Sequence, residues 1–460
     1  MKLGVVILAA GTGKRMRSDL PKVLHPLAGR PMLAHVVAAA TRLGAARTVV
    51  VYGHGGEQVR AALADSACVW VEQAQQLGTG HAVLQALPQV QDMDRVLVLY
   101  GDVPLVDPDT LGRLIAASAD CELGVLTALM DDPTGYGRII RDATGRILRS
   151  VEQKDGTAEE LAVQEVNTGF LVAERVRLDG WLKGLTNANA QGEYYLTDVI
   201  GMAVAAGERV ASVHPLTLEE VSGVNDRVQL AVLERFHQRR LAEDLMRNGA
   251  TLADPARIDI RGRLTTGRDV AIDINLICEG DVTFGDGVCI GPNCLIRDSI
   301  LGDGVQVFAN CVIEGAQIGA GARIGPFARL RPEARLAPDT HIGNFVEIKK
   351  ATVGEGSKVN HLTYIGDADI GAGVNVGAGT ITCNYDGANK FRTTIGDGAF
   401  IGSNASLVAP VTIGAGATIG AGSVISAEAP AGELTLTRAR QTTIPGWQRP
   451  QKSPKPGAAE

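Results

Sequence analysis

Residues 395–425 read IGDGAFIGSNASLVAPVTIGAGATIGAGSVI, and an aliphatic residue returns at every sixth position. The same period occurs further upstream. Its positions are Ile324, Leu330, Leu336, Ile342, Ile348, Ile395, Ile401, Leu407, Ile413 and Ile419. Small residues often follow them, as expected at tight corners, where a Cβ is hard to place. This period predicts a parallel β-helix, in which aliphatic side chains point inward and stacked coils share one core.

Length, charge and cysteine usage set limits on the protein class. The chain has 460 residues, too many for one core, so two or more domains are expected. A net charge of −7 argues against broad nucleic-acid binding, and no apolar run is long enough to span a membrane. The start of the chain lacks a signal-peptide pattern, and the cysteines form no CxxC pair. We therefore expect a reduced, cytoplasmic protein with no nucleic-acid or membrane partner.

Three cysteines fall inside the repeats. Cys289, Cys294 and Cys311 lie among the periodic aliphatic positions. Cysteine often behaves as a small hydrophobic residue. We expect all three to be small core residues of the β-helix.

The N-terminal part of the chain has a different hydrophobic pattern. Residues 5–8, 48–52 and 96–100 are short apolar runs, and helical patterns at 32–43 and 110–119 separate them. Buried parallel strands that alternate with helices predict an α/β sheet. Ligands of such sheets bind beyond the carboxyl ends of the strands.

Four segments follow from these patterns. Residues 1–225 form the α/β domain, and 226–249 a linker helix that Asp226 caps and Asn248-Gly249 ends. Residues 250–437 form the β-helix, and 438–460 a tail whose Lys- and Pro-rich part, 452–457, predicts disorder.

A glycine-rich turn follows the first strand. Gly11 and Gly13 can expose backbone N–H groups to phosphate oxygens, and Lys14, Arg15 and Lys22 supply positive charge. The spacing is neither a Walker A motif nor a complete Rossmann fingerprint. Taken alone, the glycines favour a simple strand-to-helix turn. The three nearby cations favour a phosphate site.

An aspartate follows the apolar strand at 96–100. Asp102 could cap the next helix, or it could hold Mg²⁺ against phosphate oxygens, since Mg²⁺ favours one or two carboxylates plus phosphates. A phosphate-binding loop at the same sheet edge favours the metal role.

The β-helix period breaks at polar residues. His361 falls there, with Arg331 and Lys349 nearby, and an insertion at 382–391 leaves the register. Functional residues concentrate on loops that a rigid scaffold holds. A lone histidine is most often a solvated turn residue, but histidine is also the natural base for an attacking amine. The neighbouring cations favour an anionic amino-sugar phosphate as substrate.

Together these motifs resemble the sugar-phosphate nucleotidyltransferases. The matching stretches are LAAGTGKRM at 8–16, Pro21-Lys22, Gln73, QLGTGHA at 76–82, YGD at 100–102, GYGRI at 135–139, Glu152, NTG at 167–169 and Val224-Asn225. Joined to a hexapeptide domain of this length, the chain resembles the bacterial bifunctional enzymes that make UDP-N-acetylglucosamine. The resemblance implies a Rossmann-like α/β uridylyltransferase domain followed by a left-handed parallel β-helix with N-acetyltransferase activity. One departure is that the family usually has Lys and Thr where this chain has Thr12 and Lys14, which leaves the role of Lys14 open.

The resemblance also implies the residues of the first site. Magnesium would be held by Asp102 and Asn225. The residues that would bind UTP and the sugar phosphate are Leu8, Ala10, Gly11, Lys22, Gln73, Gly78, Thr79, Tyr100, Gly101, Gly137, Glu152, Asn167 and Asn225. Gln73 and Gly78 would read the uracil edge. The sugar 1-phosphate would attack the α-phosphorus of UTP and expel pyrophosphate.

For the second site the resemblance implies His361 as general base. Glucosamine-1-phosphate would be bound by Arg331, Lys349, Tyr364, Asn375 and Lys390. Acetyl-CoA would be bound by Ala378, Asn384, Tyr385, Ser403, Ala421 and Arg438. Acetylation would precede uridylyl transfer, and a homotrimer is implied because such sites lie between adjacent β-helices. Two alternatives are a nucleotidyltransferase with a purely structural or regulatory β-helix and a non-catalytic assembly subunit.

Overall fold

The computed structural model describes residues 1–11, 13–53 and 55–451 and divides the chain into two compact units. The first holds Met1–Asn248, Leu252–Leu264 and Ile277–Asp281, and the second holds Gly249–Thr251, Thr265–Leu276 and the chain from Val282 on. Thr12 and the stretch 452–457 lie outside the described residues. None of the helices described is long and apolar enough to cross a membrane.

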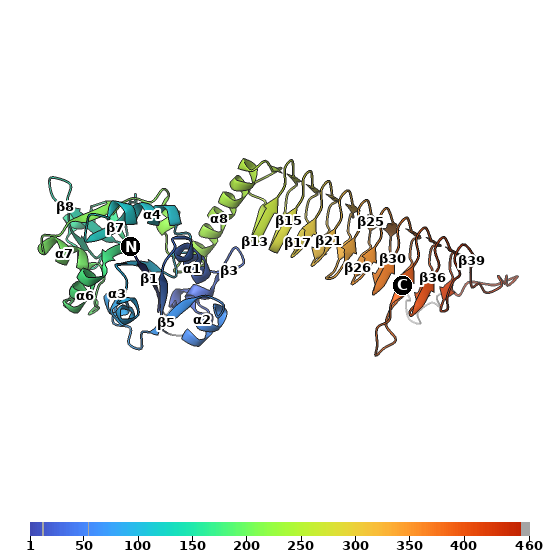
Figure 1. Ribbon diagram of the computed structural model, residues 1–460, viewed down its shortest axis with the longest axis horizontal. Helices are drawn as coiled ribbons and strands as arrows, with labels where there is room; N and C mark the ends of the chain where they lie inside the picture. The colour runs from blue at the N-terminus through green and yellow to red at the C-terminus, as the bar shows by residue number, and fades with distance from the viewer. Residues whose placement is uncertain (12, 54, 452–460) are drawn as a thin grey trace, which may run out of the picture. The chain divides into compact units, whose positions relative to one another are not determined.

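A mostly parallel sheet forms the centre of the first unit (Figure 1). Its order is β11-β7-β10-β6-β1-β4-β5, with β8 and β9 attached to β10. The strands are β1 (Leu3–Ala9), β4 (Arg47–Tyr52), β5 (Cys68–Glu72), β6 (Arg95–Tyr100), β7 (Leu123–Leu129), β8 (Gly137–Arg141), β9 (Ile147–Val151), β10 (Glu165–Glu174) and β11 (Val210–Val213). β10 runs antiparallel to β6 and β7. The three strands expected from the apolar runs are therefore β1, β4 and β6, at the middle of the sheet.

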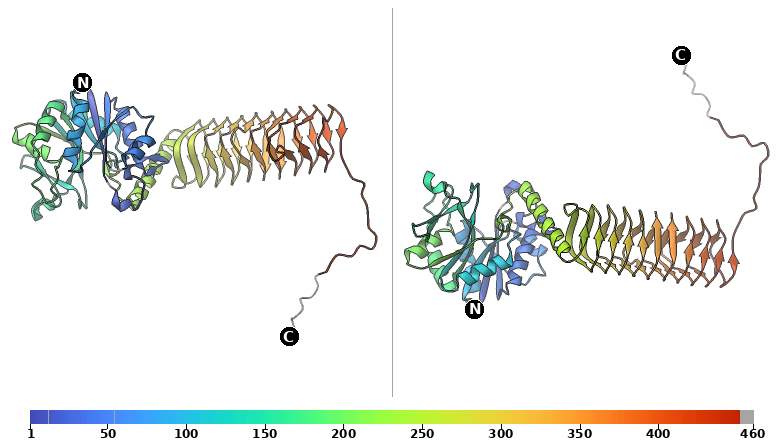
Figure 2. Two further views of the ribbon diagram at one scale, coloured as in Figure 1. Left: turned by 90° about the horizontal axis from the view of Figure 1, so that it is seen from below. Right: turned by 90° about the horizontal axis from the view of Figure 1, so that it is seen from above.

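Helices cover both faces of this sheet (Figure 2). They are α1 (Met32–Arg42), α2 (Gly56–Ala62), α3 (Thr79–Ala86), α4 (Pro108–Ala117), α5 (Ala158–Leu161), α6 (Arg175–Lys183) and α7 (Asp198–Ala205). Successive side chains of a strand point to opposite faces. Val5 and Ile7 of β1 accordingly pack in the core with α1 and α4, whereas Val6 and Leu8 pack with α3, α6 and α7. This two-sided burial explains why the strands read as continuous apolar runs.

From Thr251 on, the chain forms a parallel β-helix built mostly from very short strands (Figure 1). Two segments of its first coils, Leu252–Leu264 and Ile277–Asp281, are counted in the first unit, and the remaining coils in the second. One sheet comprises β12 (Thr251–Leu252), β14 (Ala271–Ile272), β16 (Cys289–Ile290), β19 (Gln306–Val307), β22 (Arg323–Ile324), β25 (His341–Asn344), β28 (Lys358–His361), β31 (Asn375–Val376), β34 (Phe400–Ile401), β37 (Thr418–Ile419) and β39 (Leu434–Thr435). The other two faces form one continuous sheet. Its strands are β13 (Ile258–Thr266), β15 (Leu276–Phe284), β17 (Leu295–Arg297), β18 (Ile300–Leu301), β20 (Val312–Glu314), β21 (Gln317–Ile318), β23 (Arg329–Leu330), β24 (Arg335–Leu336), β26 (Glu347–Lys349), β27 (Thr352–Val353), β29 (Tyr364–Gly366), β30 (Ala368–Ile370), β32 (Ile381–Cys383), β33 (Thr393–Ile395), β35 (Ser406–Val408), β36 (Val411–Ile413) and β38 (Val424–Ile425).

The periodic aliphatic side chains fill the β-helix core, as predicted. Val307, Ile324 and Ile342 stand in register on successive coils, and each is at least 98% buried. One expectation is wrong: Cys294 and Cys311 are buried, but Cys289 is exposed. The reason is strand alternation, because the next residue, Ile290, occupies the inward position of β16.

The insertion marks the point where the coil period changes. Lys358 pairs with Asn375, one ordinary coil further along the chain. Asn375 then pairs with Phe400, so the next coil contains a longer segment. The extra residues form a loop that leaves the stack between β32 and β33. The break predicted at 382–391 is therefore a real excursion from a rigid scaffold.

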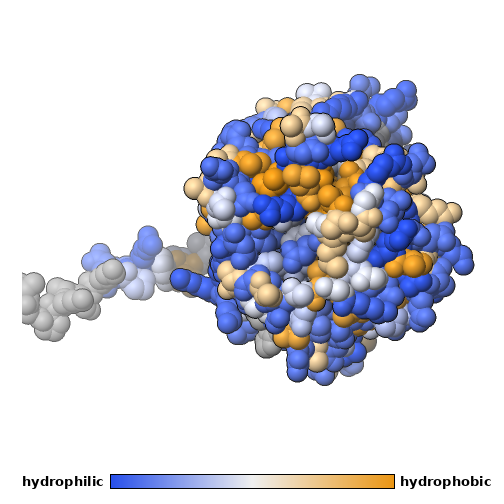
Figure 3. Space-filling view, turned by 90° about the vertical axis from the view of Figure 1, so that its left-hand side faces the viewer, coloured by the Kyte–Doolittle hydropathy of each residue, from blue (hydrophilic) through white to orange (hydrophobic). Residues whose placement is uncertain are grey.

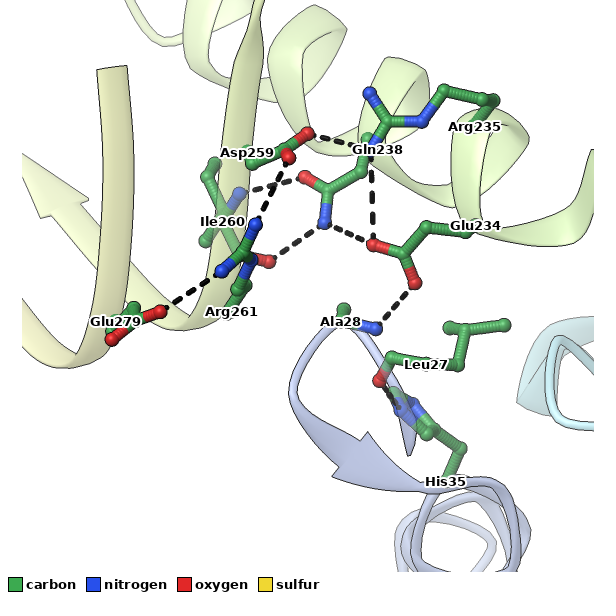
Figure 4. A network of polar contacts seen from close by, with 10 residues as sticks. All are labelled: Leu27, Ala28, His35, Glu234, Arg235, Gln238, Asp259, Ile260, Arg261 and Glu279. Atoms are coloured by element: carbon green, nitrogen blue, oxygen red, sulfur yellow. Dashed lines mark hydrogen bonds and ion pairs between the residues drawn. The ribbon is translucent and has the colours of Figure 1, made fainter. Parts of the chain in front are cut away.

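The long helix α8 (Arg227–Arg247) belongs to the first unit. Asp226 caps it as predicted, because its side chain accepts hydrogen bonds from the backbone N–H groups of Val228 and Gln229. Gln238 in α8 is buried, and its amide pairs with both backbone groups of Ile260 at 2.7 and 2.8 Å (Figure 4).

Two further contacts complete this network. Glu234 accepts a 2.7 Å hydrogen bond from Ala28 N–H, in the turn between the short strands β2 (Pro26–Leu27) and β3 (Arg30–Pro31) (Figure 4). Arg235 forms a 2.6 Å ion pair with Asp259. Within the first unit, α8 therefore joins the β2–β3 hairpin to the strand segment that contains Ile260.

Candidate active sites

A cleft of about 270 Å³ opens at the carboxyl ends of β1 and β6. Its lining residues are Leu8, Ala9, Ala10, Gly11, Lys22, Val23, Gln73, Gln76, Gly78, Thr79, Ala82, Tyr100, Asp102 and Glu193. This is the sheet edge where ligands of α/β folds bind. Figure 3 shows one face of the first unit, where apolar side chains gather in a hollow that hydrophilic side chains surround.

The glycine-rich turn packs tightly against Lys22. Gly13 has φ +60°, and a Cβ there would lie 2.7 Å from the Cβ of Lys22. Glycine is therefore required for both the backbone conformation and the close approach. Lys14 and Arg15 are exposed and do not line the cleft, whereas Lys22 does. Of the three predicted cations, only Lys22 lies where it could contact a phosphate in the cleft.

Lys22 brings the two predicted metal ligands together. Its Nζ lies 2.5 Å from Asp102 Oδ2 and 3.5 Å from Asn225 Oδ1, and both Lys22 and Asp102 are largely buried. Asp102 also anchors the segment that leads into α8, because its carbonyl accepts the Val224 N–H. Asp102 and Asn225, which are 80 and 203 positions from Lys22 in the sequence, thus converge on its ammonium group.

This arrangement fits a divalent cation held jointly with phosphate. The Lys22 ammonium shows that the oxygens of Asp102 and Asn225 can face one positive charge. Within the described residues no three His, Cys, Asp or Glu side chains form a metal cluster by themselves. Mg²⁺ needs no such cluster, because it takes one or two carboxylates and completes its shell with phosphate oxygens and water.

At the far end of the cleft, Gln73 and Gly78 form a polar pair. The Gln73 Nε2 group donates to Gly78 O at 3.0 Å. Gly78 has φ +108°, and a Cβ there would lie 2.7 Å from Tyr194 O, so only glycine fits. The adjacent Thr79 Oγ1 accepts the Leu196 N–H at 3.1 Å, which ties this loop to the segment beside it.

A second group of predicted residues surrounds Tyr100. Burial raises the pKa of the Tyr100 hydroxyl, and the nearby carboxylates of Glu152 and Asp102 raise it further. Burial also raises the pKa of Glu152, against a 2.8 Å hydrogen bond from Thr197. A Cβ on Gly137 would lie 3.3 Å from Glu152 Oε1. These contacts place Glu152 between Gly137 and the tyrosine at the cleft wall.

Two other predicted residues make hydrogen bonds near this group. Asn167 donates to Ser150 Oγ at 3.2 Å and accepts the Gly169 N–H at 2.9 Å. Gly101 continues the strand ladder, since its N–H donates to Leu8 O at 2.9 Å.

Some cleft residues were missed from the sequence. Glu193 lines the cleft, and Thr197 holds Glu152, yet no local motif marks either position. Gln76 is part of a matching motif but had no assigned role. Its Nε2 donates to Ala10 O at 2.6 Å and links the loop at 73–78 to the glycine-rich turn.

In the β-helix, His361 lies at the end of β28, exposed, with its Nδ1 2.9 Å from Asn344 Oδ1. The two residues occupy equivalent positions on successive coils. With the Asn344 amide oxygen turned toward Nδ1, the neutral ring carries its proton on Nδ1 and keeps the lone pair on Nε2. The geometry therefore leaves Nε2 available as a base.

Three predicted acetyl-CoA residues continue this column along the same corner. The next coil places Ala378 after His361, since Gly379 N–H donates to His361 O. Asn404 N–H then donates to Ala378 O, and Gly422 N–H to Ser403 O, so Ser403 and Ala421 follow in order. Near the end of the column the Arg438 guanidinium approaches Gly420. The corner thus forms an extended strip that begins at the histidine.

Cations gather on the face that follows this corner. Arg331 and Lys349 stand in adjacent coils, and Arg331 forms a 2.9 Å ion pair with Glu347. The ammonium of Lys390 lowers the pKa of Lys349, and lost hydration and Arg331 lower it further. Three positive charges at one place, only one of them paired with Glu347, suit a phosphate dianion.

The inserted loop carries Lys390 to this face. Phe391 N–H donates to Asn384 O at 2.9 Å and closes the neck of the loop, while Tyr385 and Lys390 form an isolated bridge just beyond it. Asn384 is buried and donates to Asp367 Oδ2 at 2.5 Å. Two predicted residues stay on the regular coils: Tyr364 begins β29 and Asn375 begins β31.

Comparisons with known proteins agree with both halves of the chain. Residues 5–164 match the MobA-like NTP transferase domain, and residues 392–427 match the bacterial transferase hexapeptide (six repeats). A solved structure of UDP-glucose pyrophosphorylase complexed with UDP-glucose is similar with a TM-score of 0.44 at 16% identity, over 52% of this chain and 100% of that chain. That likeness is too low to carry the assignment, which rests on full-length relatives.

Three such relatives are each described as "Bifunctional protein GlmU". The protein from Ralstonia nicotianae is 60% identical over 98% of this chain and 100% of its own length. The proteins from Ralstonia pickettii and Cupriavidus pinatubonensis are 58% and 59% identical, over 99% and 98% of this chain and all of their own lengths.

Fold and sites thus define a nucleotidyltransferase domain joined to a hexapeptide β-helix transferase. The chain belongs to the GlmU family. It is therefore a bifunctional enzyme that makes UDP-N-acetylglucosamine through acetyltransferase and uridylyltransferase activities. The alternatives in which the β-helix is only a scaffold, or the chain is non-catalytic, are set aside.

Proposed function

We propose that the cleft of the first unit binds UTP and N-acetylglucosamine-1-phosphate and that Lys22 is central to uridylyl transfer. A phosphate oxygen of the sugar attacks the α-phosphorus of UTP, and the bond to the leaving pyrophosphate breaks. Two anions must meet, so charge neutralisation and positioning dominate, and no protein nucleophile is required. The observation that best supports this proposal is the position of Lys22 Nζ, which contacts both Asp102 and Asn225 beside the glycine-rich turn.

Asp102 and Asn225 are the proposed holders of Mg²⁺. When bound, the ion would neutralise phosphate charge and orient the two phosphates. The Lys22 ammonium, which lies beside both residues, would then be available to the phosphates held at Gly11. Glu152, Asn167 and the backbone at Gly137 are the proposed sugar contacts.

For acetyl transfer we propose His361 as the general base. The amine nitrogen of glucosamine-1-phosphate attacks the thioester carbonyl of acetyl-CoA, and His361 Nε2 takes the amine proton. The C–S bond then breaks, and the leaving thiolate takes that proton from His361 and departs as CoA thiol. Asn344 holds the imidazole in the required tautomer at 2.9 Å. Arg331, Lys349 and Lys390 bind the sugar phosphate, with Tyr364 on β29, the strand next to that of Lys349, and Asn375 on β31, the strand next to that of His361.

Acetyl-CoA is proposed to lie along the strip that begins at His361. Ala378, Ser403 and Ala421 offer exposed or half-exposed backbone at one corner, and Arg438 near its end can meet the phosphates of CoA. Asn384 and Tyr385 approach from the loop, and backbone or side-chain donors there steady the tetrahedral oxyanion. We propose that N-acetylation comes first and that its product, N-acetylglucosamine-1-phosphate, then binds in the cleft of the first unit.

We propose that the protein is a homotrimer assembled through the β-helix. Phe327, Phe345 and Leu362 project from one corner of successive coils and are 50%, 55% and 64% exposed. All three have positive φ, which is unusual for bulky residues, and the two phenylalanine rings stack at 5.3 Å. These three residues form an apolar ridge that is exposed to water in the single chain. Such a ridge supports the proposal that a second copy of the chain buries it. Leu362 adjoins His361, so this contact would complete the acetyl-transfer site.

A cytoplasmic location is proposed as well. All seven cysteines are free, although Cys294 and Cys311 lie next to each other in the β-helix core. Free thiols are typical of a reducing compartment.

The test measures each activity separately in the native chain and in His361→Ala. We expect the native chain to release CoA thiol with glucosamine-1-phosphate, and the variant to lose this by a factor of about 10² or more while still releasing pyrophosphate from UTP and N-acetylglucosamine-1-phosphate. Lys22→Met serves as the reciprocal control. Thiol release at the native rate in His361→Ala would exclude the proposed base.

A further inference from the structure

His81 is a histidine next to the cleft to which the proposed reaction assigns no role. It lies on α3, one turn before Gln85. Its Nδ1 is 3.0 Å from Gln73 Nε2, and its Nε2 is 3.2 Å from the Gln85 amide. Gln73 itself is 4% exposed and lines the cleft. A short polar chain therefore runs from the wall of the nucleotide cleft to the outer side of α3.

The chemistry of the three groups determines their orientation. Gly78 O can only accept, so the Gln73 group that lies 3.0 Å from it must be the NH₂. The same NH₂ faces His81 Nδ1, which must therefore be the unprotonated nitrogen. The proton of neutral His81 then sits on Nε2, and the Gln85 amide turns its oxygen toward it, since the two ends of an amide have the same shape.

This orientation leaves one acceptor and one donor for a base in the cleft. Both donor hydrogens of Gln73 are used within the protein, and among the described residues its Oε1 has no hydrogen-bond partner. Gly78 O already accepts from Gln73 and from the Ala82 N–H, whereas the Gly78 N–H donates to no described group. An acceptor beside a donor matches the N3–H and the neighbouring carbonyl of uracil. Cytosine presents the reverse pattern, with a bare N3 and an amino group.

We propose that His81 is a positioning residue that sets the choice of pyrimidine by holding the Gln73 amide in one orientation. The proposal rests on the proposed uridylyl transfer and deepens it. Gly78 O favours the same orientation, so His81 supplies one of the two hydrogen bonds that hold the Gln73 amide. Without the acceptor at Nδ1 this preference is weaker, and the amide turns more often to present its NH₂, which matches the bare N3 of cytosine. His81 itself does not touch the base; it acts through Gln73.

The experiment compares UTP and CTP as substrates of the full-length protein. Pyrophosphate release with N-acetylglucosamine-1-phosphate gives kcat/KM for each nucleotide in the native chain, in His81→Leu and in His81→Asn. We expect His81→Leu to lower the UTP-to-CTP ratio roughly tenfold, the scale of one misplaced hydrogen bond. His81→Asn should restore the ratio, because its Oδ1 can accept from Gln73 close to the place of Nδ1. The change should fall mainly on KM for UTP, since the reacting phosphates are untouched.

The outcomes separate the two proposals. A native chain that releases no pyrophosphate from UTP overturns the proposed function. A native chain that prefers UTP, with the same ratio within twofold in His81→Leu, overturns the role of His81 alone. A simple loss of stability would lower both rates equally, and thermal unfolding and acetyl transfer report on it.

A measurement on the native chain covers the case in which His81→Leu does not fold. Long-range ¹H–¹⁵N spectra of histidine-labelled protein report which ring nitrogen carries the proton. The expected result for His81 is the Nε2–H tautomer. The Nδ1–H tautomer would require the opposite orientations of the Gln73 and Gln85 amides and would refute the proposal.

Discussion

Replacing Gln238 by Leu tests whether the amide of α8 holds a backbone segment within the first unit. The side chain is 2% exposed and makes three hydrogen bonds of 2.7–2.8 Å: two with the backbone of Ile260 and one with Glu234 (Figure 4). Leucine has a similar volume but no polar atoms. The variant therefore leaves the Ile260 N–H and C=O, which lie in a buried residue, without partners.

The size of the effect follows from these contacts. Each buried backbone group left unpaired costs about 1–3 kcal/mol, so the two groups of Ile260 together cost about 2–6 kcal/mol. Glu234 adds little, because it keeps its 2.7 Å hydrogen bond from Ala28. A loss of this size is a large part of the stability of an ordinary domain.

Hydrogen exchange and urea unfolding measure the two sides of this prediction. In Gln238→Leu we expect faster exchange of the Ile260 amide and a lower unfolding midpoint, with the largest change in peptides covering 258–264. Arg239→Gln is the matched control, because that side chain is 71% exposed on the same helix, and its effect should stay within about 0.5 kcal/mol. If Gln238→Leu unfolds within about 0.5 kcal/mol of the native chain and Ile260 keeps its protection, the reasoning is wrong.

Three further predictions concern the sites. Lys22→Met should lower kcat/KM for uridylyl transfer by a factor of about 10²–10³ and leave acetyl transfer unchanged, as pyrophosphate and thiol release would show. Gly78→Ala should raise KM for UTP and reduce stability by about 1–3 kcal/mol, since φ +108° strains any side chain; equal KM values in the variant and native chain would contradict this. Lys390 lowers the pKa of Lys349, so Lys349 loses its charge at lower pH than an ordinary lysine and phosphate binding weakens as pH rises. In the native chain the KM for glucosamine-1-phosphate should therefore rise with pH, and Lys390→Met should move this rise to higher pH. A move to lower pH would contradict the assigned cause.

Much of the first site could be predicted because its parts are local motifs. The glycine-rich turn, Asp102 after β6 and Gly78 before α3 each follow a strand or precede a helix, and parallel strands bring their carboxyl ends to one edge. Residues that act from a distance could not be found in the same way. Thr197 holds Glu152 from a segment with no motif, and His81 is inconspicuous until its Nδ1 is seen beside Gln73.

The sequence alone determined the β-helix, because its period is a repeated local constraint: each coil needs an inward aliphatic side chain and compact corners. It also determined the buried strands of the α/β sheet, whose apolar runs need no partner to be recognised. Tertiary structure alone decided which polar groups meet. It placed Asp102 and Asn225 on one lysine ammonium, aligned Asn344 with His361 one coil later, and left Cys289 outside the core. The physical reason is that hydrophobic periodicity is written along the chain, whereas the orientation of a hydrogen bond depends on atoms that only folding brings together.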